Sequence, residues 1–490
     1  MILDLRGRNY ASKRIIRKIK TIMKKPTFAA LLFLMSLDAV AENSEKIEAE
    51  KRRNYYVRSK SYSSNPESDP PQYVKQLDKT KIEAFKNINW IDAGLATRVR
   101  FEHRDNDYRR SVDNTDNPIL LRTQAYFGVK NILDPLRFAV ELQNSKRYHS
   151  EFARSTGDVN KLDVFQAYGE LYFKNPLILD RPVSLRAGRM AFELIDRKML
   201  ARDDWGNTGT NFQGFRATIG EKENDWQLDS FAMQPMKKLL EKSDEVSEGD
   251  WVYGGVLNWR RWSEIVTLQP FFMKLTQEKS SSSLTTRNIN SPGMRLYGTF
   301  GESSFDYDLI GVYQFGESAN EPTRAHAYAA ELGYNYQHEW KPRLSLVYGY
   351  ASGDKNSGDG KNQRFERFFG FNRSWSNSNH IEWENIETVK SRIEFQPDKK
   401  LSFDGSYSFY WLASSTDELE RANLRDSSGA SGDYVGRDFD FRAHYEITNN
   451  LRSTLGYARF MPGKFTKDTS HRNGASDFIY LELTFSLFGK

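Results

Sequence analysis

The sequence predicts an all-β fold, a transmembrane antiparallel β-barrel of about eighteen strands. Three observations lead to this prediction. From Ile91 onward, apolar and polar residues alternate in runs of about ten residues. Aromatic residues make up 14% of the chain, yet the mean hydropathy is only −0.70. A barrel strand explains all three, because it meets lipid on one face and water on the other and so needs apolar side chains only at alternate positions.

Composition excludes several other classes of protein. A mean hydropathy of −0.70 is too low for a bundle of transmembrane helices. The chain has no cysteine, so it has neither disulfides nor cysteine-ligated metal. The net charge of +6 arises at the N-terminus, since 62 of the 71 basic and 63 of the 65 acidic residues lie after residue 41. The near-neutral remainder gives no support to nucleic-acid binding.

Residues 1–41 have the pattern of a secretory signal peptide. A basic stretch ending at Lys25 precedes an apolar run over 28–37, and residues 39–41 (Ala-Val-Ala) form a small-x-small cleavage pattern. The apolar run is too short to span a bilayer as a helix. A start at Met23 would give a shorter signal of the same kind, and a buried helix is the alternative. The pattern predicts export from the cytoplasm.

The rest of the chain divides into a leader and the barrel. Residues 42–88 are polar and charged, which predicts a poorly ordered leader on the periplasmic side. Residues 89–490 carry the alternation and form the predicted barrel. The predicted strands lie at 91–103, 120–130, 136–147, 163–173, 183–190, 213–220, 225–234, 251–259, 265–275, 293–301, 304–314, 325–335, 343–351, 386–395, 401–412, 435–446, 451–459 and 477–487.

The connections and the last strand support this reading. Long and short connections alternate along the chain, as in barrels with long external loops and tight periplasmic turns. The longest include 191–212, 352–385 and 413–434. Strand 477–487 is rich in aromatic residues, which is the usual signal for the barrel assembly machinery. With its apolar face toward lipid and lipopolysaccharide, such a chain belongs in the outer membrane of a Gram-negative bacterium.

The polar face of the strands predicts a charged pore. Arginines there would select anions, and the acidic residues opposite would hold the guanidinium groups in place. Structural salt-bridge ladders are the alternative reading, and both can hold at once. Trp205 and Trp411 fit an interfacial aromatic belt or, alternatively, a sugar platform. The candidate pore residues from this alternation are Arg98, Arg100, Arg122, Glu141, Arg186, Arg216, Arg392, Arg442 and Arg452.

Several short motifs resemble the alginate export family of outer-membrane proteins. They are Leu185-Arg-Ala-Gly-Arg189, Leu194-Ile-Asp-Arg197, Asp204-Trp-Gly-Asn207 and Phe212-Gln-Gly-Phe-Arg216, with Glu141-Leu-Gln-Asn-Ser145 before them. The resemblance covers roughly residues 90–488. It implies an eighteen-stranded barrel whose arginine-rich pore passes an anionic polysaccharide. By motif position, it carries over Arg122, Glu141, Arg186, Arg189 and Arg216 as pore residues.

In one respect the chain departs from that family. Its exporter type has a long periplasmic turn near the end of the chain that plugs the pore, whereas the corresponding turn here, residues 447–450, is short. The resemblance therefore implies a channel, and it does not carry over gating by such a plug.

No pattern predicts a catalytic, metal or cofactor site. The chain lacks a phosphate-binding glycine loop and a G-x-S-x-G elbow, and its seven histidines are not spaced like zinc ligands. Residues 354–360 resemble a calcium loop but have Gly358 at the fifth position. A surface hydrolase would have to use Asp438, Asp440 and His444, which share one strand face. The expected function is passive transport of an anionic polysaccharide such as alginate, or its fragments. A general small-solute porin is the alternative.

Overall fold

The computed structural model describes residues 69–111, 114–176, 180–260, 262–263, 265–278, 285–300 and 303–489. The predicted signal peptide and the leader up to residue 68 lie outside the described residues. The barrel lies in one compact unit, Tyr55–Thr299 with Ser304–Lys490, to which Phe300 and Ser303 do not belong. In the described part of the chain, no helix is long and apolar enough to cross a membrane.

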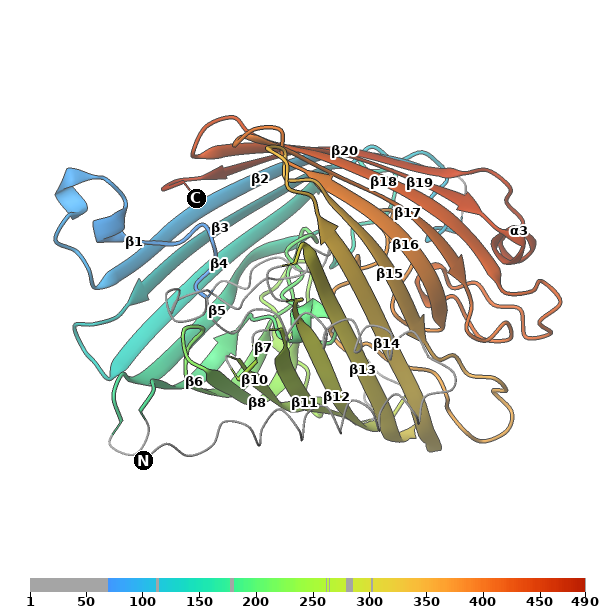
Figure 1. Ribbon diagram of the computed structural model, residues 1–490, viewed down its shortest axis with the longest axis horizontal. Coiled ribbons are helices and arrows are strands. Elements are labelled where there is room, and N and C mark those ends of the chain that lie inside the picture. Colours follow the sequence, from blue (N-terminus) through green and yellow to red (C-terminus); the bar gives the residue numbers. More distant parts are fainter. Residues whose placement is uncertain are drawn as a thin grey trace, which may run out of the picture. The chain divides into compact units, whose positions relative to one another are not determined.

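Eighteen long strands form the wall of the barrel, and two short strands and a few short helices accompany them (Figure 1). The long strands are β2 (Ile91–Asp105), β3 (Ile119–Val129), β4 (Leu136–Tyr148), β5 (Asn160–Phe173), β6 (Val183–Met190), β7 (Phe212–Ile219), β8 (Trp226–Lys237), β10 (Trp251–Trp259), β11 (Thr267–Gln277), β12 (Arg287–Thr299), β13 (Phe305–Ser318), β14 (Glu321–Asn335), β15 (Arg343–Ala351), β16 (Ile386–Phe395), β17 (Leu401–Trp411), β18 (Tyr434–Glu446), β19 (Leu451–Pro462) and β20 (Ser476–Ser486). The short elements are β1 (Lys75–Gln76), η1 (Leu77–Lys79), η2 (Glu83–Phe85), η3 (Ile195–Arg197), β9 (Glu245–Val246), η4 (Glu420–Ala422) and α3 (Lys464–Ser470).

Antiparallel pairing closes the sheet on itself. Each long strand pairs with the next, and β10 pairs directly with β8, while β9 only adds to the end of β8. Strand β20 pairs with β2 from Ala96↔Ser486 to Asp105↔Asp477. Closure removes every long free edge, which a strand surrounded by hydrocarbon requires. The predicted eighteen-stranded antiparallel barrel is confirmed.

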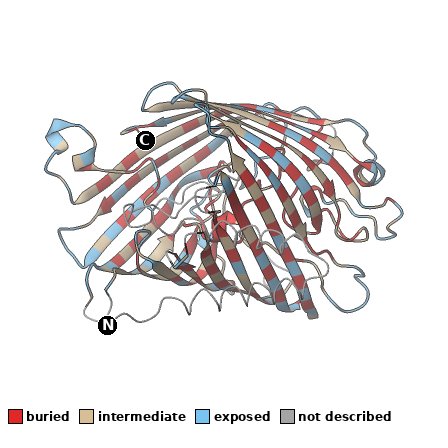
Figure 2. Cartoon of the chain, in the orientation of Figure 1, coloured by how far each residue is buried: buried red, intermediate tan, exposed pale blue. Residues whose placement is uncertain are grey.

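The two faces of the wall differ as the alternation predicts. Along β4, Phe138 and Val140 are 45% and 41% exposed, whereas Ala139 between them and Glu141 after them are buried. Figure 2 shows the same alternating bands along most strands. Because the exposed residues are mainly apolar, the outer surface suits hydrocarbon and the inner surface carries most of the charge.

Strand β12 begins six residues before the predicted start at 293. The six added residues end at Pro292, which lacks the N–H that a ladder needs. In the structure β12 continues through this residue, with Phe272 opposite Pro292 and the register intact on both sides. The backbone hydrogen bonds of neighbouring residues hold β12 in the sheet although Pro292 has no N–H to donate.

The last part of the predicted leader is folded. Residues 69–88 contain β1, η1 and η2, and β1 pairs with the start of β2. Tyr73 and Val74 are only 9% and 7% exposed. The expectation of poor order therefore does not hold for 69–88. Its apolar side chains find partners on the barrel, which the polar composition of the segment alone does not reveal.

Two long connections that the sequence placed outside turn into the barrel. They are the β6–β7 loop (residues 191–211) and the β15–β16 loop (residues 352–385). The loops pair with each other, since Ala201 donates to the carbonyl of Phe369 at 2.9 Å and Phe371 to that of Arg197 at 2.7 Å. The interior is thus filled with folded chain as well as side chains.

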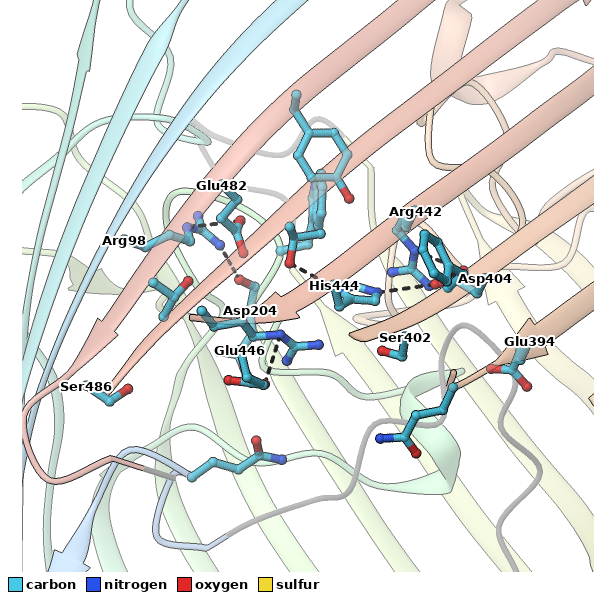
Figure 3. A pocket seen from close by; sticks show the side chains of 18 of the residues that line it. Arg98, Asp204, Glu394, Ser402, Asp404, Arg442, His444, Glu446, Glu482 and Ser486 are labelled. Atoms are coloured by element: carbon cyan, nitrogen blue, oxygen red, sulfur yellow. Dashed lines mark hydrogen bonds and ion pairs between the residues drawn. The ribbon is translucent and has the colours of Figure 1, made fainter. Parts of the chain in front are cut away.

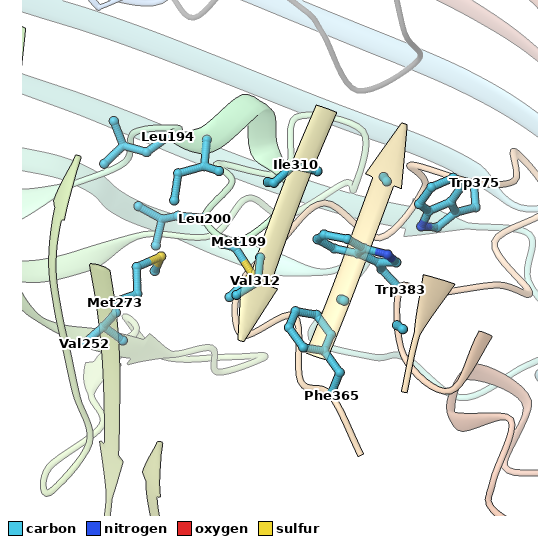
Figure 4. Packing of buried hydrophobic residues seen from close by; sticks show 14 of the residues in the cluster. Leu194, Met199, Leu200, Val252, Met273, Ile310, Val312, Phe365, Trp375 and Trp383 are labelled. Atoms are coloured by element: carbon cyan, nitrogen blue, oxygen red, sulfur yellow. The ribbon is translucent and has the colours of Figure 1, made fainter. Parts of the chain in front are cut away.

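An apolar core inside the barrel holds these loops. Leu200 and Met199 of the β6–β7 loop and Trp383 of the β15–β16 loop pack in one cluster with Val252 and Ile310 of the wall (Figure 4). The inner face of β8 to β15 is therefore partly apolar. This corrects the expectation of a polar lumen face all round, because here the inner face meets protein and not water.

Candidate functional site

Two cavities inside the barrel meet at Trp205. The long-loop cavity, about 310 Å³, lies among residues of the long connections and the ends of β2 and β3 nearest them. The short-turn cavity, about 550 Å³, reaches the short turns at 396 and 449–451. Trp205 lines both. The β6–β7 loop thus crosses the interior between the two cavities at Trp205, and this crossing is called the constriction below.

Arg98 and Arg122 fasten that crossing to the wall. Arg98 donates to the carbonyls of Asp204 and Gly206 at 2.8 and 2.7 Å, and Arg122 donates to the same two carbonyls at 3.0 Å. Register places the two arginines directly opposite each other on β2 and β3. These predicted pore residues thus hold a loop at the constriction, and their guanidinium groups add positive charge there.

Two guanidinium groups flank the ring of Trp205. The Cζ atoms of Arg100 and Arg373 lie 4.3 and 4.6 Å from the ring centroid, and Tyr480 meets it edge-on at 4.8 Å. Arg100 also donates to the Trp205 carbonyl at 2.9 Å and to Glu482 at 3.3 Å. Cation–π contacts of this kind fix an indole in place. Trp205 therefore lies inside the barrel, which is wrong for the interfacial belt and leaves the sugar platform as a prediction.

Glu141 is the centre of a buried network. Its carboxylate accepts hydrogen bonds from Arg202 at 2.5 Å, Tyr73 at 2.7 Å and Gln124 at 3.1 Å, and Gln166 donates to its other oxygen. The residue is fully buried. Its partners come from four different segments, so this predicted site residue joins the wall, the β6–β7 loop and the N-terminal segment.

Arg186 and Arg216 both bind the carboxylate of Asp69. Their Nη1 atoms lie 2.5 and 3.3 Å from the same oxygen of Asp69. Each also pairs with a carboxylate of the wall, Arg186 with Glu170 at 2.9 Å and Arg216 with Asp229 at 2.7 Å. A cavity of about 430 Å³ adjoins them, here called the Asp69 cavity. The two predicted arginines are thus brought together, at a place separate from Trp205.

Arg189 lies apart from these networks. By the alternation of β6 it shares the face of Leu185, which is 44% exposed. Its guanidinium donates to the carbonyls of Val164 and Asp244 at 2.8 and 3.1 Å. Arg189 therefore binds the backbone of β5 and of the connection that follows β8, and it does not lie beside Arg186.

Arg392 and Arg442 line the short-turn cavity. Figure 3 shows Arg442 beside Asp404 and His444. Arg442 donates to Asp404 at 2.7 Å, and the ring of His444 lies 3.2 Å from the other oxygen of that carboxylate. Arg392 donates to Glu394 at 2.7 Å and lies 3.7 Å from Asp404. The two guanidinium groups therefore border the cavity in a ladder of alternating charge.

Arg452 completes this wall of the cavity. It lies 3.4 Å from Glu446, and its side chain is 33% exposed. That is more than the 14% of Arg442 or the 6% of Arg392. Of the three, Arg452 is therefore the most open to a passing solute.

The residues considered for a hydrolase have other partners. Asp438 accepts hydrogen bonds from Ser376 and Ser378, and Asp440 accepts one from the backbone of Asn377 at 3.2 Å. The two carboxylates therefore hold the β15–β16 loop, while His444 pairs with Asp404. Within the described ranges, no group of three or more acidic or histidine residues could hold a metal ion.

The sequence analysis did not predict the site residues that lie on the two inward loops. Arg202 and Arg373 contact Glu141 and Trp205, but neither lies on a strand, so alternation could not find them. One signal was present. Residues 196–204 combine three acidic with three basic side chains within one connection. Such a charge density suggests contacts inside a polar interior.

The comparisons with known proteins agree with this architecture. The alginate export family matches residues 89–479. No curated protein matches the chain. Among solved structures, OccD3 (OpdP) of Pseudomonas aeruginosa aligns with a TM-score of 0.57 at 14% identity, over 81% of this chain and 91% of that one. OpdK of the same organism, solved with vanillate, aligns with a TM-score of 0.56 at 11% identity, over 81% and 98%. OccK11 (OpdR) aligns with a TM-score of 0.53 at 14% identity, over 81% and 96%.

Proposed function

This chain belongs to the alginate export family, and from that premise we propose that it is an outer-membrane channel for passive transport of an anionic polysaccharide such as alginate, or of its fragments. The closed barrel with an apolar exterior locates it in the outer membrane. The constriction at Trp205 favours fragments over an intact polymer. The indole separates two cavities, and each of them suits a short saccharide.

The charge of the long-loop cavity carries this proposal. Its lining contains eight cationic and four acidic side chains. Three further carboxylates, Asp107, Glu382 and Glu482, pair with Arg109, Arg421 and Arg100. With these included, the cationic side chains still outnumber the carboxylates by one. A water-filled recess with such an excess concentrates anions at its mouth. The cationic residues are Arg100, Arg104, Arg109, Arg110, Arg147, Lys238, Arg373 and Arg421, and the acidic ones are Glu102, Asp116, Asp158 and Asp203.

Guanidinium groups suit a uronate chain in particular. Each sugar of such a chain presents a carboxylate, and the fork of an arginine can bind both of its oxygens. The next arginines lie beyond the constriction, where Arg442 and Arg452 border the short-turn cavity. We infer that a carboxylate is passed between these groups down its concentration gradient.

A general small-solute porin is the second candidate. It is favoured by the short-turn cavity, where six cationic side chains face five acidic ones. Because Arg442 and Arg392 are paired with Asp404 and Glu394, this cavity alone would discriminate weakly by charge. The two candidates thus differ in whether the arginines select the solute or mainly stabilise the wall.

Planar-bilayer recordings separate the two candidates. For the channel of anionic saccharides, we expect a reversal potential that indicates anion selectivity, and block by a mannuronate trisaccharide but not by maltotriose. Arg110→Gln with Arg452→Gln, one cation from each of the two cavities, should weaken both effects. Arg459→Gln is the matched control, since Arg459 lies on β19 like Arg452 but is 47% exposed and pairs with Asp477. Selectivity and block that are the same in the double variant and in the control would favour the general porin.

A further inference from the structure

The segment before β2 enters the barrel where the sheet closes. On β2, pairing with β20 begins at Ala96, so the first residues of β2 lack that neighbour. There β1 takes the free edge, with Lys75 opposite Ala93 and Gln76 opposite Asp92 (Figure 1). The preceding residues, 69–74, lie against the inner side of the wall. They are called the inner segment below.

A glycine of the wall makes room for this segment. A Cβ atom on Gly94 would lie 2.7 Å from the carbonyl oxygen of Tyr73 and 2.9 Å from the Cα of Val74, closer than side chains tolerate. Tyr73 reaches from this seat to Glu141, to which its hydroxyl donates at 2.7 Å. The seat is therefore shaped for close contact with the backbone of the inner segment.

The first residue of the inner segment places a carboxylate between two arginines. Arg186 and Arg216 stand opposite each other on β6 and β7, and the same oxygen of Asp69 lies 2.5 and 3.3 Å from their Nη1 atoms. Burial opposes the charge on Asp69, but the guanidinium groups of Arg186 and Arg216 outweigh it and hold the pKa of Asp69 below its usual value. Asp69 therefore presents an anion to the pair.

The contact is open enough to be exchanged. The side chain of Asp69 is 40% exposed, whereas those of Arg186 and Arg216 are 18% and 11% exposed. The Asp69 cavity also holds the amides of Asn258 and Gln269, groups that bind hydroxyls. The guanidinium groups of Arg186 and Arg216 bind the carboxylate of Asp69, which is part of the chain. They can equally bind the carboxylate of a free solute.

We propose that the inner segment is a built-in competitor, whose Asp69 carboxylate occupies a binding site for the carboxylate of a uronate fragment at Arg186 and Arg216. A bound fragment displaces Asp69, and the inner segment leaves the Asp69 cavity. This inference rests on the proposed transport of anionic saccharides and adds to it a tethered carboxylate that competes with the solute.

Removing the competing charge should tighten binding of the fragment. In Asp69→Asn, the concentration of mannuronate trisaccharide that blocks half the current should fall about tenfold, a change of about 1.4 kcal/mol, because the fragment no longer competes with a charged carboxylate. Asp78→Asn is the control, because it removes the same charge from the same stretch of chain outside the Asp69 cavity. An unchanged half-blocking concentration in Asp69→Asn would overturn the inference.

A second variant tests the same point without touching the carboxylate. Gly94→Leu should push the inner segment from its seat, and it should lower the half-blocking concentration as Asp69→Asn does. The slower migration after heating that marks a folded barrel in gels verifies its assembly. If both variants bind the trisaccharide as the original chain does, the inner segment is only a structural part of the wall.

A spin label separates failure of this inference from failure of the proposed function. The chain has no cysteine, so Gln72→Cys offers a single labelling position on the inner segment. With the trisaccharide, or in the Asp69→Asn background, the label should become mobile. A label that stays immobile in both conditions refutes displacement even if the channel is anion-selective. A mobile label in a channel without anion selectivity supports the competitor and counts against the proposed transport.

Discussion

Single arginines in this barrel have different roles, although their positions on the strands look alike. Arg98 and Arg122 bind backbone carbonyls of an inward loop, Arg442 pairs with Asp404, and Arg452 is one-third exposed beside its cavity. The partner of each guanidinium decides whether it can also attract a solute. An arginine whose donors all bind protein oxygens mainly holds a loop in position. An exposed arginine can also bind the carboxylate of a passing solute.

One carboxyl of the β15–β16 loop should make the channel sensitive to pH. Burial raises the pKa of Glu384 to about 8, the charge of Glu382 adds to this, and Arg367 and Arg364 oppose it. The group is therefore mostly neutral at pH 7 and acquires its negative charge as the pH rises through about 8. We expect anion selectivity, measured from reversal potentials between pH 6 and pH 9, to fall across that interval.

The corresponding variants make this prediction specific. In Glu384→Gln the fall near pH 8 should disappear, because the amide cannot ionise. Glu384 and Glu420 both line a further cavity of about 750 Å³. Glu420→Gln is the control, since Glu420 is 47% exposed and pairs with Arg364 at 2.8 Å. Persistence of the fall in Glu384→Gln would assign it to another group.

At the scale of elements, the two inward loops decide the width of the pore. The β6–β7 loop crosses between the cavities, and the β15–β16 loop supports it through the paired residues Leu200 and Phe369. Wall carboxylates such as Asp438 anchor the second loop at hydroxyls of Ser376 and Ser378. Loops held on several sides form a fixed constriction.

Shortening the side chain at the crossing should widen this constriction. Trp205→Ala removes the indole that lines both cavities, so single-channel conductance should rise severalfold while the guanidinium groups of Arg100 and Arg373 remain. Trp262→Ala is the matched control, because Trp262 is 49% exposed. Equal conductance in the two variants would mean that the narrowest point lies elsewhere.

At the scale of the whole molecule, the apolar exterior and the closure of the sheet determine where the protein can exist. Leu481 and Leu455 lie opposite each other on β20 and β19 and are 40% and 49% exposed. Side chains in this position have hydrocarbon as their only suitable neighbour. The barrel therefore depends on a bilayer for its stability, whatever passes through it.

Charges on the exterior should be costly in proportion to their depth. Leu481→Arg, near the middle of β20, should lower the free energy of unfolding in lipid vesicles by about 2–4 kcal/mol, and Leu487→Arg, beyond the end of that strand, by about 0–1 kcal/mol. Guanidinium titration followed by tryptophan fluorescence measures both. Costs that are equal at the two positions would contradict the placement of this face in hydrocarbon.

The wall of this barrel can be predicted from local patterns in the sequence. Alternation with a period of two located eighteen strands, their outer faces and the candidates Arg98, Arg186 and Arg442, because the contrast between lipid and water acts on each strand locally. Even the closing strand β20 was recognisable from its own residues.

The chain segments that fill the interior of the barrel depend instead on long-range contacts. The contact of Arg98 with Asp204 joins residues 106 positions apart, and that of Arg186 with Asp69 joins residues 117 positions apart. No local pattern records such a meeting, since a polar loop can be solvated outside a barrel as well as bound within it. The inward loops, the place of Trp205 and the seat of the inner segment therefore follow from contacts that exist only once the barrel has closed.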